Sequence, residues 1–242
     1  MTIRNGSTIV EAVRATLAAE PRIDAGHHHL ALAFEGGAVT LEGELGTVAA
    51  KKLALERAAA VRGVRGVVDR LRVTPARRMG DSEIRDHVGD ALLFEPALAR
   101  CALRVRSGRQ VRPLREPDGA AGSVTVEVMG GVATLDGEVP SLAHKRLAGV
   151  LAWWVPGTRD VVNGLEVVPP EADDDGEICD AVRIALEKDP LVDAGRIQVG
   201  AHRSVVTLGG VVPSEPEREM AEQDAWCVFG VDDVVNRIAV GA

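Results

Sequence analysis

One pattern of residues occurs three times along the chain and restricts the folds that the chain can adopt. Isoleucine, valine, leucine and proline follow one another at intervals of four residues, in the segments 9–21, 84–96 and 178–190. Apolar side chains at this spacing line one face of a helix, and the proline prevents the helix from continuing. Each copy therefore predicts an amphipathic helix that ends before its proline.

A second pattern follows each predicted helix. Its strand-like segments are AVTLEGEL (38–45), VATLDGEV (132–139) and VVTLGGVV (205–212), in which apolar residues alternate before a glycine. Helical segments follow at roughly 47–61, 141–155 and 214–228, and closing strands lie within 61–73, 155–167 and 228–240. The intervals Gly43–Gly63, Gly137–Gly157 and Gly210–Gly230 are all 20 residues. The second glycine of each pair is predicted to end its helix in a left-handed conformation.

Each copy thus predicts the order helix, strand, strand, helix, strand. The first strands are LALAF (30–34), VTVEVM (124–129) and IQVGA (197–201). A strand–helix–strand crossover is right-handed and places its helix on one face of the sheet. We expect an α+β protein of three tandem αββαβ modules, each a three-stranded mixed sheet packed with two helices. The expected bounds are 1–76, 80–169 and 174–242, with linkers near 74–81 and 168–176.

The strand V-x-L-x-G, a helix and then GV-x-x-V-x-N-x-L-x-V together resemble the BON domain family of bacterial osmotic-stress and nodulation proteins. The third copy matches the closing pattern best, from Gly230 to Val240, whereas the first has Asp69 in place of Asn and the second has Thr158 after Gly157. The resemblance implies an αββαβ fold and a role in binding phospholipid or envelope surfaces. It transfers no catalytic motif.

The second copy carries an insertion, CALRVRSGRQVRPLREPDGAAG, at roughly 101–122. With the residue before it, this segment holds six arginines: Arg100, Arg104, Arg106, Arg109, Arg112 and Arg115. The Ser-Gly pair at 107–108 suggests a hairpin arm. Because guanidinium groups match phosphate and carboxylate oxygens, we predict an anion- or partner-binding surface there. The alternative is a solvated surface loop whose arginines increase solubility or pair with acidic residues of the third copy.

Charge is distributed unevenly along a chain whose net charge is −8. Residues 51–115 contain 16 basic and 7 acidic residues, a net charge of +9, and residues 160–242 contain 6 and 18, a net charge of −12. Such opposite fields favour docking within the chain or head-to-tail association of copies. The alternative, which the sequence supports equally well, is that the two segments form independent solvated surfaces.

Aromatic residues make up only 2% of the chain. Trp153 and Trp226 share one position in the repeat, and adjacent helical residues point about 100° apart, so Trp153 and Trp154 cannot both be central in one core. We predict interface roles for Trp153, Trp154 and Trp226, against the alternative of a half-buried side chain at a module edge. Asn163, Asn236 and Asp69 are predicted to form local bulges or turns in the closing strands.

Other functions have little support. The histidines at 27–29 offer at most two ligands on one strand face, and three cysteines without a CxxC pair indicate neither zinc site nor disulfide framework. Walker A, GxGxxG and GxSxG motifs are absent. The carboxylates Glu42, Glu44, Asp136 and Glu138 are more typical of a solvated turn. We expect no catalytic residues, metal or cofactor. Scarce aromatics and an acidic net charge argue against nucleic-acid binding.

The sequence shows neither a signal peptide nor an apolar stretch long enough to cross a bilayer, which predicts a cytoplasmic protein. The leading hypothesis is a non-catalytic binding or scaffold protein that contacts anionic phospholipid surfaces or protein partners. The alternative is a self-assembling structural or stress-response protein whose modules form a homo-oligomer. A third option is that the protein senses a small ligand or ion between modules, but no residues in the sequence indicate a pocket.

Overall fold

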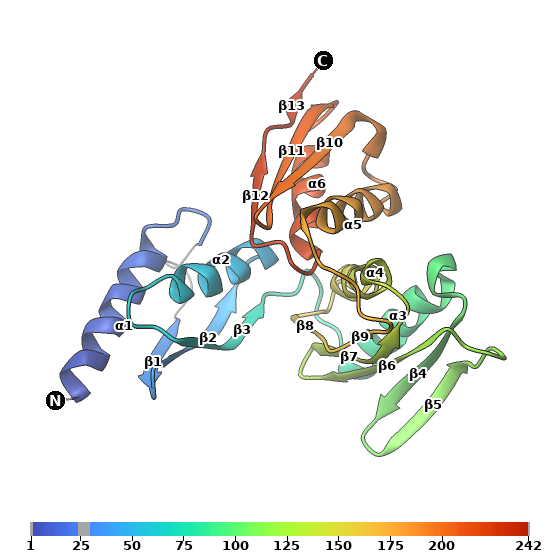
Figure 1. The fold of residues 1–242 in the computed structure, drawn as a ribbon, viewed down its shortest axis with the longest axis horizontal. Coiled ribbons are helices and arrows are strands. Elements are labelled where there is room, and N and C mark those ends of the chain that lie inside the picture. Colours follow the sequence, from blue (N-terminus) through green and yellow to red (C-terminus); the bar gives the residue numbers. More distant parts are fainter. Residues whose placement is uncertain (1, 24–29, 242) are drawn as a thin grey trace. The chain divides into compact units, whose positions relative to one another are not determined.

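The computed structural model describes residues 2–23 and 30–241. Its contacts divide the chain into two compact units, residues 1–74 and 75–242. The first unit holds one helix-and-sheet module, and the second holds two (Figure 1). We call these modules 1, 2 and 3 in chain order, and the predicted α+β fold class is confirmed.

Module 1 has the predicted order of elements. They are α1 (Thr2–Ala18), β1 (Ala31–Glu35), β2 (Ala38–Leu45), α2 (Val48–Ala59) and β3 (Gly66–Val73). The sheet order is β1-β2-β3, in which β1 and β2 run antiparallel and β2 and β3 run parallel. Val39, Leu41 and Leu45 of β2 are buried, whereas the residues between them are half-buried or exposed. The helices therefore cover one face of a mixed sheet.

Module 2 has the same order but a larger sheet. Its elements are α3 (Asp81–Phe94), η1 (Pro96–Leu98), β4 (Cys101–Ser107), β5 (Gln110–Arg115), β6 (Gly122–Met129), β7 (Val132–Val139), α4 (Leu142–Trp153), β8 (Asp160–Asn163) and β9 (Glu166–Val167). The sheet order is β5-β4-β6-β7-β8, with β9 also paired to β7. The inserted segment thus supplies β4 and β5, so this sheet has more than the three strands expected.

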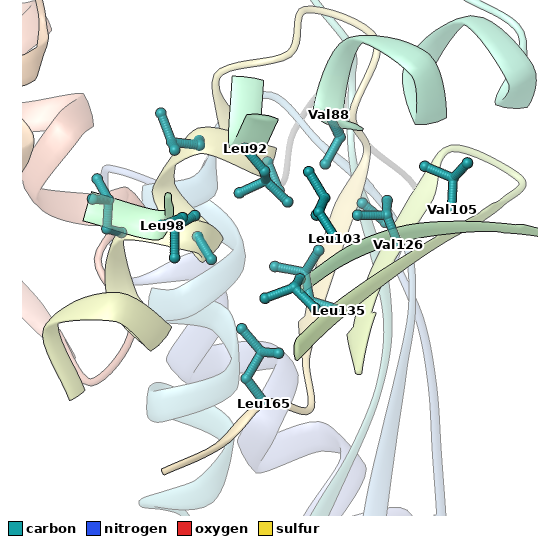
Figure 2. Packing of buried hydrophobic residues seen from close by; sticks show 14 of the residues in the cluster. Val88, Leu92, Leu98, Leu103, Val105, Val126, Leu135 and Leu165 are labelled. Carbon is teal, nitrogen blue, oxygen red and sulfur yellow. The ribbon is translucent and has the colours of Figure 1, made fainter. Parts of the chain in front are cut away.

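The insertion joins the sheet because one side of β4 is apolar. Cys101, Leu103 and Val105 alternate along the strand and are buried in the core. Figure 2 shows Leu103 and Val105 in this core with Val126 of β6 and Leu92 of α3. β4 runs parallel to β6 and antiparallel to β5. The arginine-rich segment is therefore an integral edge of the module 2 sheet rather than a separate arm.

Module 3 repeats the pattern without an insertion. Its elements are α5 (Asp175–Lys188), η2 (Ala194–Arg196), β10 (Ile197–His202), β11 (Val205–Val212), α6 (Glu215–Cys227), β12 (Asp233–Asn236) and β13 (Ala239–Val240). The sheet order is β10-β11-β12, and β13 also pairs with β11. In each module the first helix buries its valine and leucine as the repeat predicts; these residues are Val13, Leu17, Val88, Leu92, Val182 and Leu186.

Asn163 and Asn236 mark local breaks in the closing strands, as predicted, whereas β3 continues through Asp69 without a break or a register shift, so the prediction is wrong there. Asn163 ends β8 and Asn236 ends β12, and their side-chain amides donate to the carbonyls of Lys145 (2.7 Å) and Arg218 (3.0 Å) in the second helix of each module. Aspartate at position 69 cannot donate in this way. In module 1, the buried ammonium of Lys51 instead lies 2.8 Å from Asp69 and donates to the carbonyl of Leu71.

The glycines that precede the closing strands differ from one another. Gly63 and Gly230 have φ values of +99° and +89°, which confirms the left-handed conformation predicted for them. Gly157 is not among the residues with positive φ, so the prediction is wrong there. A Cβ at this position would lie 2.6 Å from Cβ of Met79 and 2.9 Å from Cγ1 of Ile84. Glycine is required at 157 because two side chains approach its backbone closely.

Candidate functional site

The hairpin of β4 and β5 presents the six candidate arginines, but it does not gather them into one cluster. Its two-residue turn contains Gly108 at φ +58°, which suits the first central position of a hairpin turn. Arg100 precedes β4 at the base of the hairpin, and Arg109 lies in the turn at its tip. Arg104 and Arg106 alternate with buried residues and lie on the face of the sheet that the helices leave open.

Arg115 is committed to internal contacts. Its guanidinium donates to three backbone carbonyls, those of Cys101 (3.1 Å), Leu93 (2.9 Å) and Leu98 (2.5 Å). These contacts join the end of β5 to the end of α3 and to η1. We therefore assign Arg115 a structural role and leave it out of the candidate surface.

Two further arginines have acidic partners. Arg104 forms a two-pronged contact with Glu116, from Nε at 2.7 Å and from Nη2 at 3.0 Å, and this contact raises the pKa of Arg104. Nη1 of Arg106 lies 3.8 Å from the carboxylate of Glu127 on β6. Both pairs are partly exposed to solvent, so their charges are partly neutralised but still accessible.

The side chains of Arg100, Arg109 and Arg112 are exposed and have neither an ion-pair nor a hydrogen-bond partner within residues 2–23 and 30–241. Two of them, Arg109 and Arg112, lie close together in sequence at the hairpin tip and on β5. One form of the solvated-loop alternative paired these arginines with acidic residues of the third copy. The described part of the chain contains no such ion pair. The tip of the hairpin is thus its least neutralised part.

The edge strand β5 is poorly suited to pairing with another strand. Ser107 and Gln110 flank the two-residue turn, so Val105 and Arg112 form the next hydrogen-bonded pair, and Arg104 and Pro113 form a non-hydrogen-bonded pair. The backbone nitrogen of Pro113, which carries no hydrogen, therefore faces the outer edge of the sheet. Proline and arginine on an edge strand disfavour strand addition. A partner would contact this edge through the arginine side chains.

A second candidate site is the contact between modules 2 and 3, which we call the seam. It forms where α4 packs against α5 and α6 (Figure 1). Half-buried Trp154 lies in it, and its indole Nε1 donates to Asp224 Oδ1 of α6 at 2.9 Å. Trp153 is half-buried as well. Trp226 is 1% exposed, and its Nε1 has no hydrogen-bond partner among the described residues.

Charged residues that the sequence did not single out also cross the seam. Arg146 of α4 is 1% exposed; its Nε donates to the carbonyl of Phe229 at 2.9 Å and its Nη2 to Asp173. Lys145 lies over the ring of Phe229, 5.1 Å from its centroid. Nζ of Lys188 in α5 lies 2.8 Å from buried Glu95 in module 2. Opposite charges of the two modules therefore meet within the chain.

The composition of α4 is the signal that could have revealed the seam. The helix LAHKRLAGVLAW buries residues around much of its circumference, whereas α2 and α6 bury fewer. A helix that is apolar on more than one face must pack on more than one side. An arginine within such a helix is therefore a candidate for a buried contact.

Asp224 is the most perturbed acid of the seam. It is 2% exposed, and burial raises its pKa to about 8. The charge of the neighbouring Asp189 raises the pKa further, whereas the hydrogen bond from Trp154 lowers it. Asp224 accepts from Trp154 through Oδ1, and its buried Oδ2 has no hydrogen-bond partner among the described residues.

The BON domain model matches the chain at residues 5–75, 114–169 and 174–242. The chain belongs to the BON domain family. The second match begins within β5, so α3 and β4 lie outside it. Nevertheless, α3 packs on β4 and β6 and buries Ile84, Val88 and Leu92 in the core of the second BON module.

Other comparisons add little. A search of curated proteins finds no match to this chain. Two solved structures resemble it at 12% identity, and both are of CdsD, a structural protein of the Type III secretion system of Chlamydia trachomatis; one is described as its C-terminal domain. Both alignments cover 97% of this chain, and they cover 92% and 98% of the solved chains. The TM-scores of 0.25 and 0.26 are too low to support a functional conclusion.

Two of the three cysteines, Cys101 and Cys179, lack the environment of an activated nucleophile. Burial raises the pKa of the Cys101 and Cys179 thiols, which is opposite to the shift that activates a thiol. Within residues 2–23 and 30–241, no group of three or more His, Cys, Asp or Glu side chains could hold a metal ion. The histidines at 27–29 lie outside the described residues. None of the described helices has the length and apolar character needed to span a bilayer.

Proposed function

We propose that the protein is a non-catalytic binding or scaffold protein and that the β4–β5 hairpin contacts anionic surfaces, with phospholipid headgroups as the first candidate. The observation that carries the proposal is the exposure of Arg100, Arg109 and Arg112 without an acidic partner among the described residues. An unpaired guanidinium is able to donate two parallel hydrogen bonds to one phosphate. The hairpin therefore has the chemistry of a headgroup contact.

The core of module 2 supports this role because it holds the hairpin in place. β4 is paired along its length with β6, and Arg115 fixes the end of β5 to three carbonyls. The arginines at the tip are therefore presented by an ordered strand pair. Val111 of β5 is 47% exposed and pairs with Arg106, so it adds an apolar group on the face of the hairpin that carries Arg104 and Arg106. Basic and apolar groups together are typical of peripheral membrane contact.

Sedimentation with lipid vesicles tests the proposal. The full chain is mixed with vesicles of neutral lipid and with vesicles that contain an anionic phospholipid, at low and at physiological salt. We expect binding to the anionic vesicles alone, weakened by salt because exposed charges are screened. Each arginine near an anionic surface contributes about 1 kcal/mol to the free energy of binding. The double substitution R109Q/R112Q is therefore expected to weaken binding roughly 30-fold.

The matched control is R14Q/R62Q, which removes the same charge from exposed arginines outside the hairpin. If the control weakens binding as much as R109Q/R112Q, net charge rather than the hairpin determines binding. Equal recovery with neutral vesicles contradicts the lipid proposal. Binding to an acidic protein without vesicle binding would assign the hairpin to a protein partner.

Self-association is the second candidate function, and the segregation of charge favours it. Segment 51–115 carries +9 and segment 160–242 carries −12. The seam pairs leave this segregation in place, because Lys188 pairs with Glu95 and Asp173 pairs with Arg146, which lies outside segment 51–115. Light scattering across a salt series tests this candidate. We expect a mass that decreases as salt increases, whereas a monomer at every ionic strength contradicts assembly through opposite charges.

A further inference from the structure

A pocket of about 240 Å³ lies in unit 2 beside the seam. Three parts of the chain form its walls: the linker before α3, one side of α3, and the end of α4 with the loop that follows. The linker is tied to that loop by a hydrogen bond from the backbone N–H of Arg77 to the carbonyl of Pro156 (3.0 Å). Met79 packs directly on Gly157, as described above. These contacts make the linker a fixed wall of the pocket.

The wall of the pocket combines apolar side chains with one guanidinium and one imidazole group. Met79, Leu151 and Val155 supply apolar surface, while Arg77 and His87 supply the polar groups. The Arg77 side chain is 69% exposed, and its contact with Glu83 at 3.3 Å is a weak exposed pair that a ligand is able to replace. Guanidinium groups donate hydrogen bonds and do not accept them. The polar side of the pocket therefore favours a ligand with a negatively charged acceptor.

The size of the pocket restricts the apolar part of the ligand. Its volume is that of about eight water molecules in the liquid. This space suits a short alkyl chain or a single ring, and the remainder of a longer acyl chain would extend from the open side of the pocket into solvent. Pockets for small molecules typically combine an apolar lining with a few polar groups that orient the ligand.

We propose that this pocket binds a small amphipathic carboxylate, whose apolar part contacts Met79 and Leu151 and whose carboxylate contacts Arg77. This inference is independent of the proposed role of the hairpin. Trp154 connects the pocket to the seam, since the residue lines the pocket while its indole donates to Asp224 of module 3. A bound ligand therefore lies against a residue that joins two modules.

Octanoate is the probe for this proposal, and NMR of the full chain gives the readout. The chain has three tryptophans, so its indole N–H signals are few, and loss of one signal in W154F identifies Trp154. We expect octanoate to produce a saturable shift of this signal. Octan-1-ol and octylammonium have the same apolar chain without the negative charge, and we expect weaker binding of the alcohol and none of the ammonium compound.

Two substitutions locate the binding. R77Q is expected to weaken octanoate binding about fivefold, which is the effect of an exposed ion pair, while the control R62Q leaves it unchanged. A91L places a larger side chain in the wall formed by α3 and is expected to abolish binding. Circular dichroism checks the fold of this variant, and A91V replaces it if it is unfolded.

Three results would overturn the proposal. The first is the absence of a saturable shift with octanoate, and the second is equal binding of octanoate and octan-1-ol. The third is unchanged octanoate binding in a folded A91L or A91V variant, because the ligand would then bind elsewhere.

Discussion

The indole N–H of Trp154 donates to Oδ1 of Asp224 at 2.9 Å and so joins the second BON module to the third. The contact consists of a half-buried donor at the end of α4 and an acid in α6 that is 2% exposed. Because Asp189 also lies beside Asp224, the seam holds two neighbouring carboxyl groups. Its stability should therefore depend on pH.

Asp224 predicts a loss of stability as pH rises. Its pKa is about 8 in the folded chain and near its ordinary value of 3.8 after unfolding, so the folded state binds the extra proton between these values. The free energy of unfolding then decreases across this range, with a limiting slope of about 1.4 kcal/mol per pH unit. D224N keeps an acceptor for Trp154 without titrating. Urea unfolding from pH 5 to 8 should show a smaller decrease for D224N than for the native chain.

Tryptophan fluorescence is the appropriate signal because all three tryptophans lie in unit 2. D180N removes an exposed acid of α5 and is the control. Parallel pH profiles for the native chain and D224N would show that Asp224 ionises at its ordinary pKa in the folded chain, which would contradict this prediction.

Substitution of Arg146, which the sequence does not single out, is predicted to cause a large loss of stability. R146M keeps apolar contacts in α4 but removes the donor to Phe229 and the partner of Asp173. Loss of one partner from a fully buried pair costs about 3–5 kcal/mol, but the Asp173 side chain is 44% exposed and becomes solvated. We expect a decrease of about 2 kcal/mol in the free energy of unfolding of unit 2.

R183M is the comparison variant because Arg183 forms an exposed pair with Asp180 in α5 and one long hydrogen bond, 3.2 Å, to the carbonyl of Val199 in the same module. Exposed pairs of this kind contribute less than about 0.5 kcal/mol. Similar unfolding curves for R146M and R183M would mean that the contacts of Arg146 do not stabilise the seam.

Asn163 predicts that aspartate is unfavourable at this position in module 2. Its amide donates to the carbonyl of Lys145, and a carboxylate there would place two acceptors against each other. Module 1 tolerates Asp69 because the ammonium of Lys51 supplies the donors. N163D should lower the free energy of unfolding by about 1–3 kcal/mol in urea denaturation, whereas N163D with the stability of the native chain would contradict this account.

Substitution of Gly157 is predicted to lower the stability through steric overlap, although the φ value of this residue does not require glycine. The added methyl group of G157A would meet Met79 and Ile84 at less than 3 Å, and relief of the overlap should cost about 1–3 kcal/mol. The space around Gly209 is open, so G209A is the control, and we expect a small effect. Thermal unfolding followed by fluorescence compares the two. Equal melting temperatures for both variants would show that the linker moves away freely.

The repeat predicted the modules because its signals are local. Helix faces with four-residue spacing, alternating strands and the glycine intervals each act within one module, and the buried valines and leucines follow them. The arginine-rich hairpin was identified as well, since its turn lies within a short segment. Its place in the sheet was not, because the parallel pairing of β4 with β6 joins residues on either side of β5.

The seam shows the opposite case. The sequence marked Trp154 as a candidate interface residue, yet nothing near it in the sequence indicates Asp224 or the carbonyl of Phe229. The role of Arg115 was also hidden, since an arginine that holds three carbonyls has the same sequence signature as one in solvent.

The sequence by itself determined the family, the three modules and the side chains that form each core, because backbone periodicity and side-chain polarity are sufficient to specify those features. Only the tertiary structure decided which charges remain available and where a pocket forms. Arg109 and Arg112 stay exposed, Arg115 and Arg146 become internal, and Arg77 borders a cavity, although all five are the same residue type. The difference arises from partners that are distant in the chain, and periodicity carries no information about them.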